Sequence, residues 1–197
     1  MSKKIKARWE WRTFGDNLEK FKGFLDRYEQ IRNIESEELY ILSRNTQVNC
    51  KIRNELLDIK IPLRIDRSYK LEQWTVFDKT GFPLSADKLA AMIQLLRVNM
   101  NWLEYDEFSY TAFLESLVNE HEDIRKVKVN KKRAIYQSDQ VFLEYSEVYL
   151  GESKYDTIAI ESADKQGVIK MREQWELNDL ENINYLRALK RVLYNYC

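Results

Sequence analysis

Residues 49–61, NCKIRNELLDIKI, are the stretch of sequence that decides the fold. Polar and apolar residues alternate in it on both sides of an interruption at residues 54–55. A period of two places successive side chains on opposite faces of a β-strand. The stretch therefore predicts a hairpin of two antiparallel strands, each with one polar and one apolar face. The polar positions outside the interruption are Asn49, Lys51, Arg53, Asp58 and Lys60.

The same alternation is present near the start of the sequence. Residues 5–14, IKARWEWRTF, place Arg8, Glu10 and Arg12 on one face of a predicted strand and two tryptophans on the other. From residue 16 to about residue 32 the apolar residues recur every three or four positions. This second pattern predicts a helix after the first strand.

Both kinds of pattern continue through the rest of the chain. We expect several strands within residues 38–77, further strands at residues 124–137, 141–150 and 157–162, helices at residues 85–96 and 108–120, and a C-terminal helical segment from about residue 166. About eight strands in hairpin-like order predict an α+β fold with an antiparallel β-barrel, closed or nearly closed, flanked by helices. A chain of this length favours a single domain over residues 1–197.

Composition limits the classes of function. The 32 Lys and Arg residues balance 32 Asp and Glu residues, which argues against a nucleic-acid partner or an anionic membrane surface. Two cysteines and one histidine provide neither a disulfide framework nor a zinc site. No stretch approaches the roughly 18 apolar residues of a membrane span, so we expect a cytoplasmic protein. Strand edges and aromatic residues would also allow a homodimer.

Several predicted strands share one charged face. If these faces point outward, the barrel interior is apolar; if they point inward, the interior is polar and the helices pack on the apolar faces outside. The excess of basic residues favours the inward arrangement, because such an interior would suit a polyanion with a divalent cation. The basic residues are Arg8, Arg12, Lys51, Arg53, Lys60, Lys70 and Arg133, and the acidic residues are Glu10, Asp58, Glu72, Glu144 and Glu161.

The basic and the acidic residues predict contacts with different parts of one ligand. Arginine binds phosphate oxygens through a bidentate fork, and lysine binds them as a point charge. Carboxylates bind Mg²⁺ or Mn²⁺, which would polarise a phosphoryl group or activate water. The charged set therefore predicts a site for a small molecule that carries a triphosphate.

The order of these motifs resembles the CYTH, or triphosphate tunnel, family, which includes thiamine triphosphatases, inorganic triphosphatases and class IV adenylate cyclases. The family's opening Glu-x-Glu-x-Lys strand is matched by residues 8–12, Arg-Trp-Glu-Trp-Arg, and its basic-pair strand by residues 51–53. The later family strands are matched by Lys60, Lys70-Leu71-Glu72, Arg133, Glu144, Leu150-Gly151 and Ala159-Ile160-Glu161. The resemblance extends from about residue 5 to residue 162.

The resemblance implies a divalent-metal-dependent phosphohydrolase that acts on inorganic triphosphate or a nucleoside triphosphate in a basic tunnel. It implies Glu10, Glu72 and Glu161 as catalytic residues and Glu10, Glu72, Glu144 and Glu161 as ligands of Mg²⁺ or Mn²⁺. It implies Arg8, Arg12, Lys51, Arg53, Lys60, Lys70 and Arg133 as phosphate-binding residues.

Two positions depart from the family pattern. Arg8 stands where the first opening glutamate is expected, and Ala159 stands where the first closing glutamate is expected. An arginine in place of a carboxylate would repel a metal ion and attract phosphate. These departures favour an alternative function, a non-catalytic module that senses or sequesters a nucleotide or polyphosphate. Adenylate cyclase activity on the same fold is a further alternative.

Overall fold

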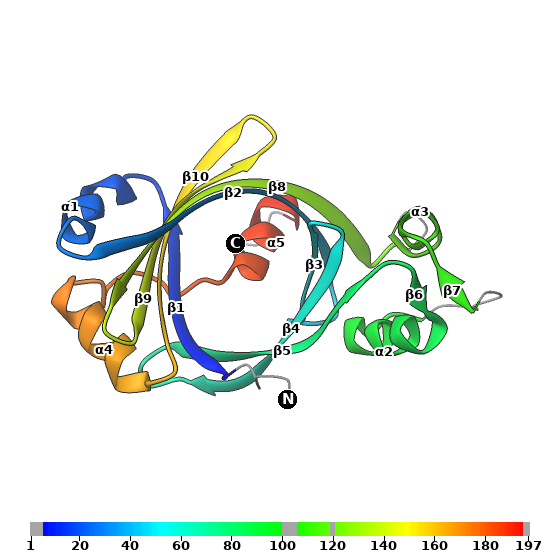
Figure 1. Cartoon of the computed structure of the whole chain (residues 1–197), viewed down its shortest axis with the longest axis horizontal. Helices are drawn as coiled ribbons and strands as arrows, with labels where there is room; N and C mark the ends of the chain where they lie inside the picture. Colours follow the sequence, from blue (N-terminus) through cyan, green and yellow to red (C-terminus); the bar gives the residue numbers. More distant parts are fainter. Residues whose placement is uncertain (1–5, 100–105, 119–120, 195–197) are drawn as a thin grey trace. The chain divides into compact units, whose positions relative to one another are not determined.

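The computed structural model describes residues 6–99, 106–118 and 121–194. Eight antiparallel strands form a closed barrel in the order β1-β10-β9-β8-β2-β3-β4-β5 (Figure 1), so the predicted α+β barrel is confirmed. The barrel strands are β1 (Arg8–Gly15), β2 (Glu29–Ser43), β3 (Asn49–Arg53), β4 (Leu56–Asp66), β5 (Leu71–Gly81), β8 (Ile124–Ser138), β9 (Val141–Leu150) and β10 (Ser153–Ser162). The remaining elements are η1 (Leu18–Phe21), α1 (Lys22–Leu25), β6 (Leu84–Ser85), α2 (Ala86–Leu96), β7 (Glu107–Phe108), α3 (Tyr110–Phe113), η2 (Leu114–Val118), α4 (Lys165–Gln174) and α5 (Tyr185–Tyr194).

The chain divides into two compact units, which are described separately below. Unit 1 comprises residues 1–37, 62–75 and 129–197, and unit 2 comprises residues 38–61 and 76–128. Strands β2, β4, β5 and β8 contribute residues to both units. The single domain over the whole chain stays a prediction.

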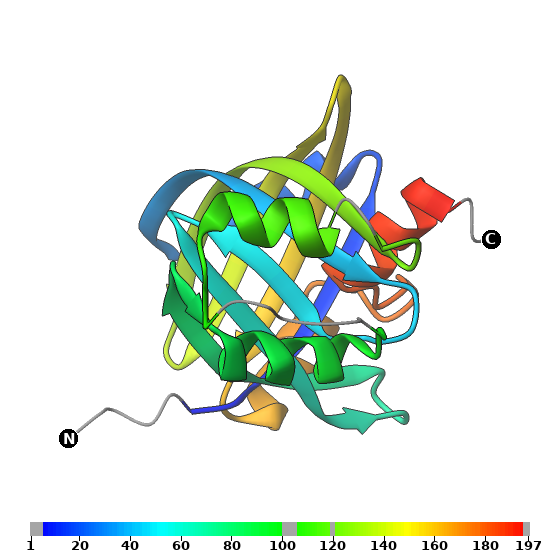
Figure 2. The ribbon, with the colours of Figure 1, turned by 90° about the vertical axis from the view of Figure 1, so that its right-hand side faces the viewer.

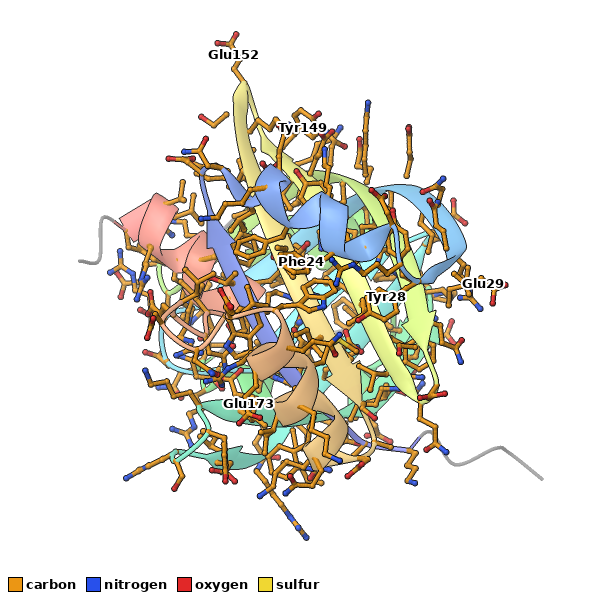
Figure 3. All side chains as sticks on the ribbon, turned by 90° about the vertical axis from the view of Figure 1, so that its left-hand side faces the viewer. Phe24, Tyr28, Glu29, Tyr149, Glu152 and Glu173 are labelled. Atoms are coloured by element: carbon orange, nitrogen blue, oxygen red, sulfur yellow. The ribbon has the colours of Figure 1, made fainter. Side chains whose placement is uncertain are left out.

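The core of unit 1 lies between the apolar face of its strands and the elements η1, α1 and α4. Trp11 of β1 and Leu71 of β5 are fully buried in this core. Trp175, just after α4, stacks on Phe24 with ring centroids 5.7 Å apart. Figure 3 shows Phe24 and Tyr28 on the outer side of the strands, between α1 and α4. Burial of these large aromatic surfaces fixes α4 against β1 and β10.

The core of unit 2 lies between α2 and the apolar faces of β3 and β4. Cys50 and Ile59 pair across these two strands and are buried together with Met92 of α2. Figure 2 shows α2 in front of these strands. The helix begins where predicted, because Ser85 is its N-cap and its Oγ accepts a hydrogen bond from the backbone N–H of Lys88 at 3.4 Å.

The charged faces of the strands point to the barrel interior in each unit. Residues that neighbour each other along a strand face opposite sides, so Arg12 lies opposite the helix-covered Trp11, and Lys51 lies opposite Cys50. In a closed barrel the face turned away from the flanking helices is the interior one. The inward arrangement of charge is therefore confirmed.

The helix predicted from residue 16 to about residue 32 is wrong beyond Leu25. Strand β2 begins at Glu29, and its position between β8 and β3 pairs its backbone in the sheet. Sheet pairing outweighs the apolar spacing, and Gly23 weakens a helix across this stretch. The helical prediction for residues 108–120 is met by α3 and η2 as far as Val118. Ile5, residues 119–120 and Cys197 lie outside the described residues.

Strand β5 begins one residue later than the charge pattern predicted. Lys70 belongs to the preceding turn and has a φ angle of 53°, so it is not part of the alternating face of β5. Within the described parts of the chain, no helix combines the length and apolar character needed to cross a membrane.

The buried thiol of Cys50 provides a test of the unit 2 core. Burial, together with the nearby charge of Asp58, raises the pKa of Cys50 to about 12. Because the thiolate is the reactive form, we expect Cys50 to resist a maleimide in the native protein at neutral pH and to react once the protein is unfolded. Mass spectrometry of the Cys50 peptide in a Cys197→Ser variant measures this. Equal rates in native and unfolded protein would contradict the packing of β3 beneath α2.

Candidate ligand-binding site

A cluster of three carboxylates surrounds one buried guanidinium on the inner face of unit 1. Arg12 is 4% exposed. Its Nε donates to Glu10 Oε1 at 2.8 Å, and its Nη1 donates to Glu144 Oε1 at 3.1 Å. Its Nη2 lies 4.0 Å from Glu161 Oε1. We call Arg12 with Glu10, Glu144 and Glu161 the Arg12 cluster.

Strand register brings the Arg12 cluster together. Strand β10 lies between β1 and β9, so inward residues of the three strands form rows across the sheet. Ala159 of β10 pairs with Arg12 on one side and with Glu144 on the other. In the next row, Glu10 pairs with Glu161. Four residues that are far apart in the sequence therefore meet on one face.

Neighbours of opposite charge hold Glu144 and Arg12 in their ionised forms. Burial alone would raise the pKa of Glu144, but the charges of Arg12, Arg133 and Lys131, with a hydrogen bond from Ser146, lower it to about 2. Burial alone would lower the pKa of Arg12, but Glu144 and Glu10 together raise it well above its ordinary value. Arg12 and Glu144 are thus both charged at neutral pH.

Arg8 joins the edge of this cluster. Its Nη1 lies 3.7 Å from Glu161 Oε2, and its side chain is 47% exposed. Its guanidinium carbon also lies 4.3 Å from the centroid of the Phe142 ring. The arginine that replaces the expected first glutamate therefore contacts the acid of the facing strand.

Glu72 of β5 is the register partner of Glu10, and its carboxylate is bound by the segment before and within α5. Arg187 Nη2 donates to Glu72 Oε1 at 2.8 Å, and Asn184 Nδ2 donates to Glu72 Oε2 at 2.8 Å. Both carboxylate oxygens of Glu72 therefore have partners within unit 1. The same segment binds β1 directly, because Asn182 Oδ1 accepts from the backbone N–H of Arg12 at 2.9 Å.

This C-terminal segment contains the site residues that the sequence patterns did not reveal. Tyr185 lies with its ring centroid 4.7 Å from the Arg12 guanidinium carbon and 3.6 Å from Lys131 Nζ. Ile183 and Leu186 are buried apolar residues of this segment, whereas the contacts with the site come from the residues beside them. The one local signal is Asn184, whose Oδ1 accepts from the backbone N–H of Arg187 at 3.0 Å and caps α5.

Arg133 of β8 carries a buried donor that has no partner among the described residues. Its register partner is Ser146 of β9, which hydrogen-bonds to Glu144, so Arg133 shares the inner face with the Arg12 cluster. Among the residues that the structure describes, no acceptor lies within hydrogen-bonding reach of the Arg133 Nε. Buried donors are almost always satisfied, so this atom indicates a place for an acceptor from a ligand or water.

Unit 2 has a separate charged cluster on the inner faces of β2, β3 and β4. Glu38 is completely buried and accepts from Lys51 Nζ at 3.0 Å and from Arg53 Nη1 at 3.3 Å. Arg53 Nη2 also lies 3.9 Å from Asp58 Oδ2. Lys60 is the half-buried register partner of Asn49 on the same strand pair. Glu38 was absent from the predicted charged set. It stands at the first residue of the region in which strands were expected, whereas β2 begins at Glu29.

Lys70 lines a cavity of about 490 Å³ in unit 1, together with Glu72, Arg67 and Arg187. A second cavity of about 410 Å³ lies on the outer face of β8 and β9 and is lined by residues such as Lys132 and Tyr145, with Arg133 at its wall. Both volumes fall within the range of small-molecule sites. The first cavity contains two of the predicted site residues, whereas the second contains one.

The buried carboxylate of Glu38 yields a prediction for stability. Glu38→Gln leaves Lys51 and Arg53 without their counter-charge, and loss of one member of a buried ion pair costs about 3 kcal/mol. We expect a fall of about this size in the free energy of unfolding, measured by urea denaturation. Glu37→Gln, at the exposed neighbouring position, is the control. Equal stability of the Glu38 variant and the parent protein would show that Glu38 does not neutralise these bases.

Comparison with known proteins supports the fold. No protein-family model and no curated protein matches the sequence. A Hippeastrum protein described as a proposed adenylyl cyclase with a dominant triphosphatase activity aligns with a TM-score of 0.54 at 10% identity, over 96% of this chain and 97% of that chain. A conserved hypothetical protein from Pyrococcus furiosus aligns with a TM-score of 0.52 at 17% identity, over 91% of this chain and 98% of that chain. The chain therefore shares the barrel fold of these proteins, as the resemblance to the CYTH family led us to expect.

Proposed function

We propose that this protein binds the triphosphate group of inorganic triphosphate or of a nucleoside triphosphate on the inner face of unit 1. The observation that carries the proposal is the buried Nε of Arg133, a charged donor with no acceptor among the described residues. A phosphate oxygen is an acceptor of the right charge, and its bond to a guanidinium is of the strong, charge-assisted kind. A hydrogen bond from Arg133 Nε to the ligand would then offset the free-energy cost of removing this donor from water.

The balance of charge around Arg133 supports an anionic ligand. The inner face of unit 1 carries Arg8, Arg12, Lys131 and Arg133 against Glu10, Glu144 and Glu161. Glu72, the register partner of Glu10, and its own partner Arg187 add one acid and one base. The total is five bases against four acids, so this set keeps one positive charge after its internal pairs are counted. Phosphate-binding roles for Lys51, Arg53 and Lys60 of unit 2, and for Lys70 of unit 1, stay separate predictions, each open to its own substitution.

Hydrolysis of the bound triphosphate is the second candidate function. It is favoured by the fold shared with the Hippeastrum protein, which is described as having a dominant triphosphatase activity. The roles of Glu10, Glu72 and Glu161 as catalytic residues are part of this candidate. Phosphate release from inorganic triphosphate and ATP would support hydrolysis, and a cyclic product from ATP would support a cyclase.

The acidic residues do not fit a divalent metal ion in the arrangement that the structure shows. No group of three or more His, Cys, Asp or Glu side chains within the described residues is placed to hold one. Glu10 and Glu144 bond to Arg12, and both oxygens of Glu72 bond to Arg187 and Asn184. The proposed function therefore does not include binding of Mg²⁺ or Mn²⁺ by Glu10, Glu72, Glu144 and Glu161.

Substitution of Arg133 tests the binding proposal. Arg133→Gln removes a charge-assisted hydrogen bond worth about 1.5 to 3 kcal/mol, so we expect the affinity for inorganic triphosphate to fall about tenfold or more. Isothermal titration calorimetry measures the affinity, and a thermal shift checks it, because a ligand at about 100 times its dissociation constant adds roughly 2.7 kcal/mol of stability.

Lys132→Gln is the matched control for this experiment. Lys132 is the next residue on β8, is exposed, and points to the outer face, so its substitution removes the same charge from the other side of the strand. We expect its affinity to equal that of the parent protein. Equal weakening by both substitutions would place the ligand in the outer cavity, and no binding by the parent protein would remove the proposed function.

A further inference from the structure

The acids that a metal ion would need are already gathered around a cation of the protein itself. The Arg12 guanidinium is 2.8 Å from Glu10, 3.1 Å from Glu144 and 4.0 Å from Glu161. Arg12 is 4% exposed, so water screens these contacts little. Its fork of donors offers separate hydrogen bonds to carboxylates that lie on different strands. A fixed positive charge therefore occupies the centre of the acidic cluster.

Ala159 allows the Arg12 side chain to reach Glu144. Arg12 on β1 and Glu144 on β9 are the register partners of Ala159 on the intervening strand β10. Neighbouring strands lie about 4.8 Å apart, so the arginine side chain must pass over position 159 to meet Glu144. Ala159 is fully buried, and a longer side chain there would take the space that the guanidinium crosses. The alanine at the position of the expected closing acid thus leaves the space through which Arg12 reaches Glu144.

Arg8 adds to this positive charge. Its Nη1 lies 3.7 Å from Glu161 Oε2, and Arg12 approaches the other oxygen of the same carboxylate. Glu161 therefore lies between two guanidinium groups. A divalent cation that bound here would be repelled by both, and it would have to take carboxylates from Arg12.

We propose that Arg12 takes the place of a divalent metal ion in this site, so that the protein binds a triphosphate as the free anion. The inference rests on the proposed function and specifies the ionic form of its ligand. Arg12 neutralises the acids that would otherwise repel phosphate oxygens, and it holds them in a fixed arrangement. The basic residues beside them, Arg133 above all, then contact an anion whose charge has not been neutralised by a metal.

Calorimetric titration of the parent protein with inorganic triphosphate, once in EDTA and once in excess Mg²⁺, tests the inference. We expect binding in EDTA to be at least as tight as in Mg²⁺, because Mg²⁺ withdraws the free anion as a complex. Binding that requires Mg²⁺ would overturn the inference and leave the proposed function intact. Absence of binding in both conditions would overturn both.

Arg12→Gln tests the role of the guanidinium with a readout that needs no ligand. Removal of its charge leaves Glu10, Glu144 and Glu161 without the cation that they share, so we expect their side chains to rearrange around Mn²⁺ in the variant and the parent protein not to bind it. The fall in the electron paramagnetic resonance signal of free Mn²⁺ measures this in the absence of triphosphate. In EDTA, we also expect the variant to bind triphosphate about tenfold more weakly or worse.

Two further variants complete the design. Arg12→Lys keeps the charge, and we expect it to exclude Mn²⁺ as the parent protein does. Arg125→Gln, at an exposed position of β8, is the matched control for loss of an arginine. Binding of Mn²⁺ by the parent protein in competition with Arg12 would contradict the inference. If circular dichroism shows that Arg12→Gln does not fold, the titration in EDTA and Mn²⁺ binding by the parent protein still decide the question.

Discussion

The neutralisation of buried charge inside the barrel is the constraint on which the rest of the structure depends. The strands turn their apolar faces toward α2 and α4, which leaves the charged faces in the interior. An ionised group away from water is tolerated only when it is paired and hydrogen-bonded. Unit 1 meets this requirement at Arg12 and unit 2 meets it at Glu38. In each unit, a central ion has partners of opposite charge on its own or nearby strands.

Pairing also distinguishes the charges that maintain the structure from those available to a ligand. Glu10, Glu144 and Glu72 have short contacts with bases of the same unit, so they contribute to the internal network. Arg133 differs because a buried nitrogen of its guanidinium has no acceptor among the described residues. Specific binding of an anion would complete a hydrogen-bond network that the protein leaves incomplete. The proposed site is therefore centred on an unpaired donor within a network of pairs.

Much of the barrel could be predicted from the sequence, because alternation along a strand reports directly on its two faces. The breaks at residues 54–55, the Ser85 cap and strand β9 all lie where the pattern placed them. The extent of β2 could not be predicted, because its pairing with strands distant in sequence outweighs a local helical spacing. Lys70 was misplaced for a similar reason, since the φ angle of 53° that ends the alternation is set by the turn.

The hydrogen-bond partners of the charged residues could not be predicted from the sequence. Alternation indicates the face on which Glu72 lies, but not that Asn184 and Arg187 occupy both of its oxygens. The departures at Arg8 and Ala159 were visible, whereas the position of Ala159 between Arg12 and Glu144 depends on the register of β1, β10 and β9. The register shows that the small residue provides the path by which Arg12 reaches Glu144. Both residues thus lie beside the Arg12 cluster, Ala159 between two of its members and Arg8 at its edge.

A crystal structure of the protein grown with inorganic triphosphate and Mn²⁺, with anomalous data for manganese, tests the central claim most directly. The account predicts phosphate oxygens at the Nε of Arg133, an Arg12 guanidinium still bound to Glu10 and Glu144, and no manganese peak among the three acids. A manganese peak between Glu10, Glu144 and Glu161, with Arg12 displaced from them, would contradict it.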